Sequence, residues 1–596
     1  MKNAITILVD SVIWDCVGTT RCKASPTPFL DSLKKESVTA TKLYSHGPYT
    51  DAATRSLYTG RRCLDDFSYF FKLNTSPTNH YKVFHDNGYE TYGLYYPYYM
   101  VGKEMRKSID HTYYTAGFIF GSEWGGCFYY YADLIKSRRL NKEEIALLKL
   151  RMAMMLDIWI EFYQDGIDHP ETIGMIKDLV SQFDVNNALR ILKEEKAKYE
   201  SAPEAYLYDF LEQGKSHTLA HLDGIDVDVK IDRRFLNDSV YKYYKKFFSY
   251  ASSINFKANW WKNRPSLKRV ISCISKYVKT RDKNDIMLIA NYLVCLNAIK
   301  GVKRQSQTHW QDLPSARTQL DFASEILENR RNNGAPFYMS LHFLEPHNYV
   351  SFFSFDSQDR RILDEEFKML EDYCYQLGSN FIGNLAYLLS IRYADYCIER
   401  FCNKLKELGV WDNTVLTILS DHGSSYSFYP LHGPHVNCFD EECYHVPMLI
   451  RIPEGNSIVI NDYHNSLDVL PTLYELMGFK KPIEVIGESM LNNSIKPKNY
   501  VITEYMGPGC PDLLSRPIWF SIRDAHYCVG YKVGIYQNFE EGELSEVYNL
   551  EKDPMGYYNI SKIVKRETIS YLLNKLKERF EEVKVDATVF IKAFLN

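Results

Sequence analysis

The chain has 596 residues, enough to bury a large core, and at about 100–200 residues per domain it should form two to four structural units. Hydrophobic residues make up 45% and charged residues 24%, as in an ordinary globular protein, and the net charge of -4 excludes a general attraction to nucleic acid. Thirteen cysteines without a paired Cys-x-x-Cys spacing favour reduced thiols, so we expect a cytoplasmic protein.

The N-terminal segment has the pattern of a buried strand. Residues 5–10 form an apolar run that is too short for a signal peptide and that ends on Asp10, where a small-residue cleavage site would be needed. A Pro-Thr-Pro entry at 26–28 then predicts a helix whose apolar face carries Phe29 and Leu30. Because no window of about 18 apolar residues occurs, we expect no membrane span.

The rest of the chain alternates α/β segments with a long helical stretch. Amphipathic helices with few strand signals predict a helical insertion, and turn-rich strands near the C-terminus predict a small antiparallel subdomain. We expect an α/β protein built on a three-layer α/β/α sandwich with a mostly parallel central sheet. The expected units, in chain order, are a first α/β part over 1–104, the helical insertion over 105–334, a second α/β part over 335–480 and the C-terminal subdomain over 481–596.

One strand ends on side chains that bind metals. Residues 414–419 are an apolar β-type run, and Asp421, His422 and Gly423 follow it almost directly. Ligands of open α/β sheets lie beyond the carboxyl ends of the strands, where these side chains would stand. An isolated Asp-His-Gly would be better explained as a polar turn with a glycine breaker, so the motif depends on its companions.

Three other segments carry side chains suited to the same site. Asp10 ends the first strand, although a lone acid there is more often a helix cap. Thr50 follows a Gly-Pro turn and opens a helix-like stretch, where its hydroxyl could meet a phosphate or act as a plain N-cap. Another strand ends in Glu345, a proline and His347.

Taken together and in this order, these segments resemble the alkaline phosphatase and sulfatase superfamily over 1–100 and about 335–560. In that superfamily the nucleophile lies nine residues before a Thr-Gly pair, and counting back nine from Thr59 gives Thr50. The first-strand acid corresponds to Asp10, and the Ser-Asp-His-Gly motif to 420–423. Further similarity lies in 466–473, 487–489 and 547–554.

Departures from the sulfatase pattern point to another branch of that superfamily. Sulfatases have Cys or Ser for conversion to formylglycine where this chain has Thr50, and a second first-strand acid where it has Ser11. The lysine of a sulfatase Gly-Lys-Trp stretch is also missing from 88–96. A threonine nucleophile is instead similar to the phosphodiesterases, phosphoethanolamine transferases and lipoteichoic acid synthases. The Leu-His-Gly stretch that contains His432 resembles the phosphoethanolamine transferases.

The resemblance implies a metal-dependent phosphoryl site. A neutral threonine hydroxyl needs a metal to become a good nucleophile, and a mixed oxygen and nitrogen ligand set suits zinc or manganese. The expected ligands are Asp10, Thr50, Asp421 and His422. His347 and His432 could bind phosphoryl oxygens, complete a second metal site or protonate the leaving group. Expected substrate contacts are His347, His432, His435 and Arg55, with Glu345 in reserve.

The function we expect is hydrolysis or transfer at a phosphodiester of a phosphorylated alcohol, glycan or lipid head group. One alternative is a sulfatase-like ester hydrolase without formylglycine. Another is an inactive member of the fold that binds glycans or surfaces, although an inactive site has no need of the retained Asp10, Thr50, Asp421 and His422.

A basic aromatic segment lies inside the predicted insertion. Residues 230–281 contain fourteen Lys and Arg against two acids, a local charge of +12, interleaved with aromatic residues such as Trp260 and Trp261. Such a segment could bind an anionic glycan, a nucleotide-linked donor or a lipid surface. It could equally be a helical cap with a solvated basic face, and no nucleic-acid motif accompanies it.

Overall fold

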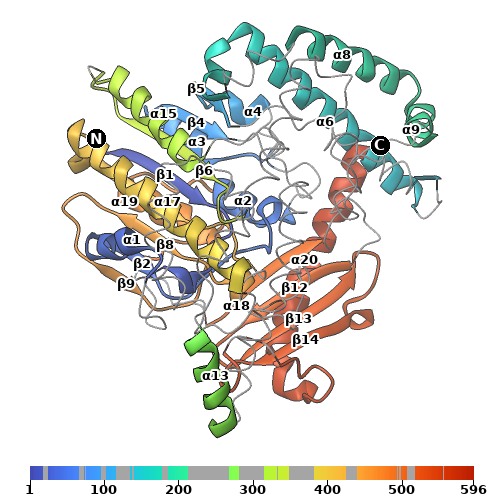
Figure 1. Ribbon diagram of the computed structural model, residues 1–596. Coiled ribbons are helices and arrows are strands. Elements are labelled where there is room, and N and C mark those ends of the chain that lie inside the picture. Colours follow the sequence, from blue (N-terminus) through green and yellow to red (C-terminus); the bar gives the residue numbers. More distant parts are fainter. Residues whose placement is uncertain are drawn as a thin grey trace.

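The centre of the molecule is an eight-stranded sheet of order β5-β4-β6-β1-β7-β8-β2-β9 (Figure 1). A computed structural model describes residues 1–17, 25–65, 73, 76–95, 103–115, 135–136, 140–176, 185–212, 267–280, 315–331, 333–347, 381–424, 439, 441–492, 494, 499–506, 517–554, 556 and 558–595. The strands are β1 (Asn3–Val9), β2 (Ser37–Ala40), β4 (Glu90–Tyr95), β5 (His111–Tyr114), β6 (Phe337–Phe343), β7 (Thr414–Leu419), β8 (Met448–Arg451) and β9 (Ile458–Ile460).

The strand directions confirm the predicted mostly parallel sheet. β1 pairs in parallel with β6 on one side and with β7 on the other. β8 is the exception, since it runs antiparallel to both of its neighbours, β7 and β2. Because β6, β1 and β7 are adjacent and parallel, their carboxyl ends meet at one edge of the sheet.

Helices cover both faces of this sheet, as a three-layer sandwich requires. Alternate residues of β1 point to opposite faces: Ile5 and Ile7 enter one apolar core, and Ala4 and Leu8 enter the other. The first core includes α1 (Pro28–Leu33), α15 (Ala316–Asn329) and α17 (Phe381–Glu407). The second includes α2 (Thr50–Thr59), α3 (His80–Asp86) and α19 (Val469–Met477).

The predicted helical insertion contains long helices and also one strand of the central sheet. Its described helices include α6 (Lys142–Asp168), α8 (Val185–Ser201), α9 (Pro203–Glu212) and α13 (Leu267–Thr280). Asn141 and Glu144 form a capping box at the start of α6. β5 falls inside the range expected for the insertion, yet it pairs in parallel with β4. Its sequence, His-Thr-Tyr-Tyr, is too short to show a strand pattern.

A second, antiparallel sheet forms the C-terminal part, as predicted. Its strands, in order, are β11 (Val501–Met506), β12 (Pro517–Arg523), β13 (Tyr527–Gly534) and β14 (Glu543–Asn549). The long helix α20 (Ser570–Leu595) packs on this sheet through a stripe that includes Leu576 and Phe580. Small elements complete the described chain: β3 (Leu43–Tyr44), β10 (His464–Asn465), α4 (Lys103–Arg106) and α18 (Glu441–Tyr444). None of the described helices is both long and apolar enough to cross a bilayer.

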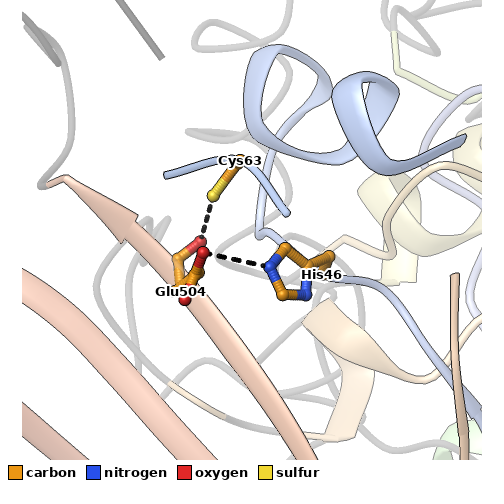
Figure 2. A group of neighbouring side chains, drawn as sticks. All are labelled: His46, Cys63 and Glu504. Atoms are coloured by element: carbon orange, nitrogen blue, oxygen red, sulfur yellow. Dashed lines mark hydrogen bonds and ion pairs between the residues drawn. The ribbon is translucent and has the colours of Figure 1, made fainter. Parts of the chain in front are cut away.

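A buried polar cluster joins helix α2 to the C-terminal part (Figure 2). His46 precedes α2 and Cys63 follows it, and both contact Glu504 of β11. His46 Nε2 lies 3.3 Å from Glu504 Oε1, and the Cys63 thiol donates to the Glu504 carbonyl oxygen at 2.9 Å. Arg579 of α20 donates to both carboxylate oxygens of Glu504, at 2.7 and 2.8 Å, and to Asp65 at 2.8 Å.

Although His, Cys and Glu are common metal ligands, these three are already engaged with protein groups. Their donor atoms lie within 4.8 Å of one another, but Arg579 occupies both oxygens of Glu504. Burial opposes ionisation of Glu504, yet the guanidinium of Arg579 outweighs it and holds the pKa of Glu504 well below its usual range. Burial also raises the pKa of the Cys63 thiol, which therefore keeps its proton. We assign the cluster a structural role.

Loss of Arg579 should destabilise the protein strongly. Arg579→Met leaves the buried carboxylates of Glu504 and Asp65 without their counter-ion, which should lower the free energy of unfolding by about 3–5 kcal/mol. The control is Arg62→Met, which removes the solvent-accessible pair between Arg62 and Glu582 and should cost about 1 kcal/mol or less. Urea unfolding measures both variants, and equal stabilities would contradict the assigned role.

Candidate functional site

Three side chains that could bind a metal meet at the carboxyl edge of the central sheet. Asp10 directly follows β1, and its N–H donates to the Phe343 carbonyl oxygen at the end of β6, at 2.9 Å. Asp421 and His422 follow β7, the strand on the other side of β1. The ligand atoms of Asp10, Asp421 and His422 all lie within 4.8 Å of one another, and all three side chains are buried. The structure thus brings together the acid and the Asp-His pair expected from the sequence.

The hydroxyl of Thr50 points into this group of ligands. Thr50 is the first residue of α2, and its Oγ1 lies 3.2 Å from Asp10 Oδ2 and 3.2 Å from His422 Nε2. The residue in the N-cap position is Tyr49, which makes no side-chain cap. The plain N-cap explanation of Thr50 therefore does not hold, because its hydroxyl faces Asp10 and His422.

Ser11 holds the two carboxylates side by side. Its hydroxyl donates to Asp10 Oδ1 at 2.6 Å, and its N–H donates to Asp421 Oδ1 at 3.2 Å. The backbone of Ser11 has a φ of 62°, in the left-handed region that costs a serine free energy. The Tyr387 hydroxyl secures this conformation by donating to the Ser11 carbonyl oxygen at 2.6 Å.

The segment after β7 is fixed closely against helix α18. Ser420 Oγ accepts from the Val12 N–H and donates to the His422 carbonyl oxygen, each at 2.8 Å. A side chain at Gly423 would place its Cβ 1.7 Å from the Glu442 carbonyl oxygen, so only glycine fits. The close packing of the loop that carries Asp421 and His422 therefore requires glycine at position 423.

The orientation of His422 suits metal ligation. Its Nδ1 lies 2.6 Å from the Gly423 carbonyl oxygen, which can accept only an N–H, so Nδ1 carries the proton in the neutral ring. Nε2 then offers its lone pair toward the carboxylates, 3.5 Å from Asp10 Oδ1 and 3.6 Å from Asp421 Oδ2. A hydrogen bond from the far nitrogen is the usual way to orient a ligating histidine.

The charges of Asp10, Asp421 and His422 favour the binding of a cation. Burial, reinforced by the charge of Asp10, raises the pKa of Asp421. Burial of Asp10 acts in the same sense, but the charge of His347 and the hydrogen bond from His342 outweigh it and hold the pKa of Asp10 well below its usual range. Burial of His422 disfavours its protonation, yet Asp421 and Asp10 together raise its pKa. The two buried carboxylates beside one imidazole form an anionic pocket whose charge a divalent cation would offset.

One buried carboxylate oxygen of the site lacks a hydrogen-bond partner in the part of the chain that the structure describes, and a bound metal ion would supply a partner for it. Asp421 Oδ1 accepts from the N–H groups of Ser11 and His422, whereas its Oδ2 is buried and has no hydrogen-bond partner among the described residues. A buried carboxylate oxygen without a partner is costly. Two carboxylates, one imidazole and the Thr50 hydroxyl are therefore a candidate ligand set for a divalent metal.

His342, which the sequence did not indicate, also contacts Asp10. His342 lies in β6 and is buried, with Nε2 3.1 Å from Asp10 Oδ2. Asp10 Oδ2 thus has both His342 and Thr50 as neighbours. A histidine within the otherwise apolar run of β6 was the available signal, but only the pairing of β6 with β1 shows which acid it meets.

The other predicted residues have different surroundings. His347 is exposed, and its charge acts on Asp10, so it lies at the rim of the site. Glu345 is buried, accepts from the Ala316 N–H, and has its pKa raised by burial to about 7. Arg55 is fully buried in α2 and is among the charges that act on Cys63. His432 and His435 lie outside the described residues.

Comparisons with known proteins agree with the fold. The sulfatase family model matches residues 234–479, a range that contains Asp421 and His422 but not Asp10 or Thr50. Lipoteichoic acid synthase 1 of Bacillus subtilis is 31% identical over 107 residues, which are 17% of this chain and 16% of that protein. The multifunctional alkaline phosphatase superfamily protein PehA of Trinickia caryophylli is 30% identical over 100 residues, 16% of this chain and 19% of that protein.

These relatives are therefore matched over less than a fifth of their own length. Among solved structures, the phosphonate monoester hydrolase of Agrobacterium radiobacter has the same fold, with a TM-score of 0.51 and 13% identity over 98% of this chain and 96% of that chain. The partial family match, the relatives and the fold agree with the strand-end site and together support membership of the chain in the sulfatase-like alkaline phosphatase superfamily.

Proposed function

We propose that this protein is a metal-dependent phosphoester hydrolase or phosphotransferase that uses Thr50 as its nucleophile on a phosphodiester. The observation that carries the proposal is the position of the Thr50 hydroxyl, 3.2 Å from both Asp10 and His422 and free of any capping role. A hydroxyl held among metal-type ligands at the start of a helix is arranged for attack on phosphorus.

Asp10, Asp421, His422 and Thr50 would hold the metal, and the unpartnered Oδ2 of Asp421 supports this. Once bound, a zinc or manganese ion lowers the pKa of the hydroxyl and offsets negative charge on the phosphoryl group. Ser11, which takes the place of a second first-strand acid, binds the two carboxylates and adds no negative charge of its own.

The reaction we propose has two steps. Thr50 first loses its hydroxyl proton to solvent. Its Oγ1 then forms a bond to phosphorus while the bond from phosphorus to the leaving alkoxide breaks, and His347 at the rim gives that alkoxide a proton. The positive end of the α2 dipole favours the phosphoryl oxygens. In the second step, water or an acceptor hydroxyl displaces Thr50 from the phospho-threonine. The proton of that water or hydroxyl passes to His347. The identity of this acceptor separates a hydrolase from a transferase.

The substrate class rests on the nucleophile and on one relative. Threonine cannot be converted to formylglycine, which supports phosphorus over sulfur, and one relative is named for the synthesis of lipoteichoic acid. We therefore propose a phosphorylated alcohol, glycan or lipid head group. The match to the sulfatase family keeps sulfate-ester hydrolysis as the second candidate.

Replacement of the nucleophile should abolish turnover. Thr50→Ala removes the attacking oxygen and should lower kcat/KM on bis-p-nitrophenyl phosphate by at least about a thousandfold. Thr50→Ser keeps a hydroxyl and should retain measurable activity and accumulate a phosphoserine detectable by mass spectrometry. Full activity in Thr50→Ala would exclude Thr50 as the nucleophile.

Metal binding should depend on Asp421. Asp421→Asn removes one of two buried carboxylate ligands and should weaken Mn²⁺ and Zn²⁺ binding by at least about a hundredfold, because even outer-shell changes cost about 10–100-fold. The matched control is Asp395→Asn, a buried acid that instead accepts from the N–H groups of Phe29 and Leu30. Equilibrium dialysis with elemental analysis measures both. If both variants bind metal as the wild type does, the proposed site is wrong.

Substrate preference should favour phosphorus. With metal supplied, the protein should hydrolyse bis-p-nitrophenyl phosphate faster than p-nitrophenyl sulfate, because Thr50 lacks the hydrated aldehyde that sulfatases use. Initial rates on both esters, with Thr50→Ala as the background, measure the preference. Turnover of the sulfate ester alone would replace the first candidate with the second.

A further inference from the structure

Helix α13 exposes a continuous apolar row. Leu267, Ile271, Ile274 and Val278 are spaced by four, three and four residues, so they lie on one face of the helix. Their side chains are 78%, 58%, 47% and 58% exposed, respectively. Single exposed apolar residues are ordinary, but an aligned row of four on a 14-residue helix marks an interaction surface.

The same helix is strongly basic. Its sequence contains Lys268, Arg269, Lys276 and Lys279 and no acidic residue, and the described side chains of Lys268 and Lys279 are exposed. The chain as a whole has a net charge of -4, so this concentration of positive charge is local. Figure 1 shows α13 at the lower edge of the molecule, beyond the C-terminal sheet.

Binding to an anionic lipid surface would involve both the apolar row and the basic residues of α13. Nucleic acid would engage the basic residues but leave the apolar row in water, and an apolar protein groove would bury the row without a use for the charges. An amphipathic helix in a membrane interface buries its apolar face among acyl chains while Lys and Arg meet anionic head groups. With 14 residues, α13 is about 21 Å long and suits a position parallel to the membrane plane.

We propose that α13 docks the protein on the surface of an anionic membrane. Leu267, Ile271, Ile274 and Val278 enter the interface, and the basic residues contact phosphate groups of the lipids. This docking does not require the proposed enzymatic activity, since it is a binding event that involves no residue of the metal site. It would bring the site to a membrane surface that carries lipid-linked phosphodiesters.

Another helix supplies a matched control for the apolar row. Val585 and Val589 of α20 are each 63% exposed and are one turn apart, so they form a smaller exposed apolar pair. Three acids near them, Glu581, Glu582 and Asp586, outnumber the two lysines at 584 and 592. Exposed apolar side chains in acidic surroundings should not attract an anionic bilayer.

Vesicle co-sedimentation of the full chain tests the proposal. We expect binding to phosphatidylcholine vesicles that contain about one third phosphatidylglycerol, little binding to pure phosphatidylcholine, and a decrease as salt rises. Ile271→Asp/Ile274→Asp should weaken binding at least about tenfold, and Lys268→Gln/Lys279→Gln should weaken it several-fold. Val585→Asp/Val589→Asp should leave it unchanged.

Two outcomes would overturn the proposal. One is equal binding of the wild type to neutral and anionic vesicles. The other is unchanged binding of the Ile271→Asp/Ile274→Asp variant, and a large fall in its Tm would then show that the row packs inside the protein. Bis-p-nitrophenyl phosphate hydrolysis without vesicles should be equal in wild type and variant, which separates this test from that of the proposed function.

Discussion

The site depends on two carboxylates that the fold forces into contact. Asp10 and Asp421 follow adjacent parallel strands, and Ser11 binds an oxygen of each, so neither can move away from the other. Two like charges buried this close together repel each other, and this repulsion adds to burial in raising the pKa of Asp421. A cation among the ligands would offset the repulsion.

The proposed nucleophile is positioned from both ends of its helix. Thr50 begins α2, and the residues on either side of that helix, His46 and Cys63, contact the same glutamate of β11. Arg579 of α20 then binds that glutamate and Asp65. The C-terminal part of the chain therefore helps to set the distance between the Thr50 hydroxyl and Asp10, although none of its described residues belongs to the site itself.

The sequence predicted those candidate site residues that lie directly after an apolar strand. Asp10, Asp421 and His422 could be predicted because each closes an apolar run, and Thr50 because its spacing from a Thr-Gly pair matched a family pattern. His342 could not, because its contact with Asp10 arises from the pairing of β6 with β1, more than 300 residues apart in the chain. Arg579 escaped prediction for the same reason, because its partners Glu504 and Asp65 are distant in the chain. β5 escaped it because four residues are too few to show a strand pattern.

In the proposed reaction, the choice between hydrolysis and transfer is made outside the buried ligand set. Asp10, Asp421 and His422 are buried and would hold the metal, so they would not select the acceptor. His347, which is exposed at the rim, lies where an acceptor hydroxyl or water must enter. Residues that border this opening decide whether water is admitted or excluded. The same buried ligand set can therefore support either hydrolysis or transfer. The difference between the two reactions must lie in the residues at the rim and in the protein surface that binds the substrate.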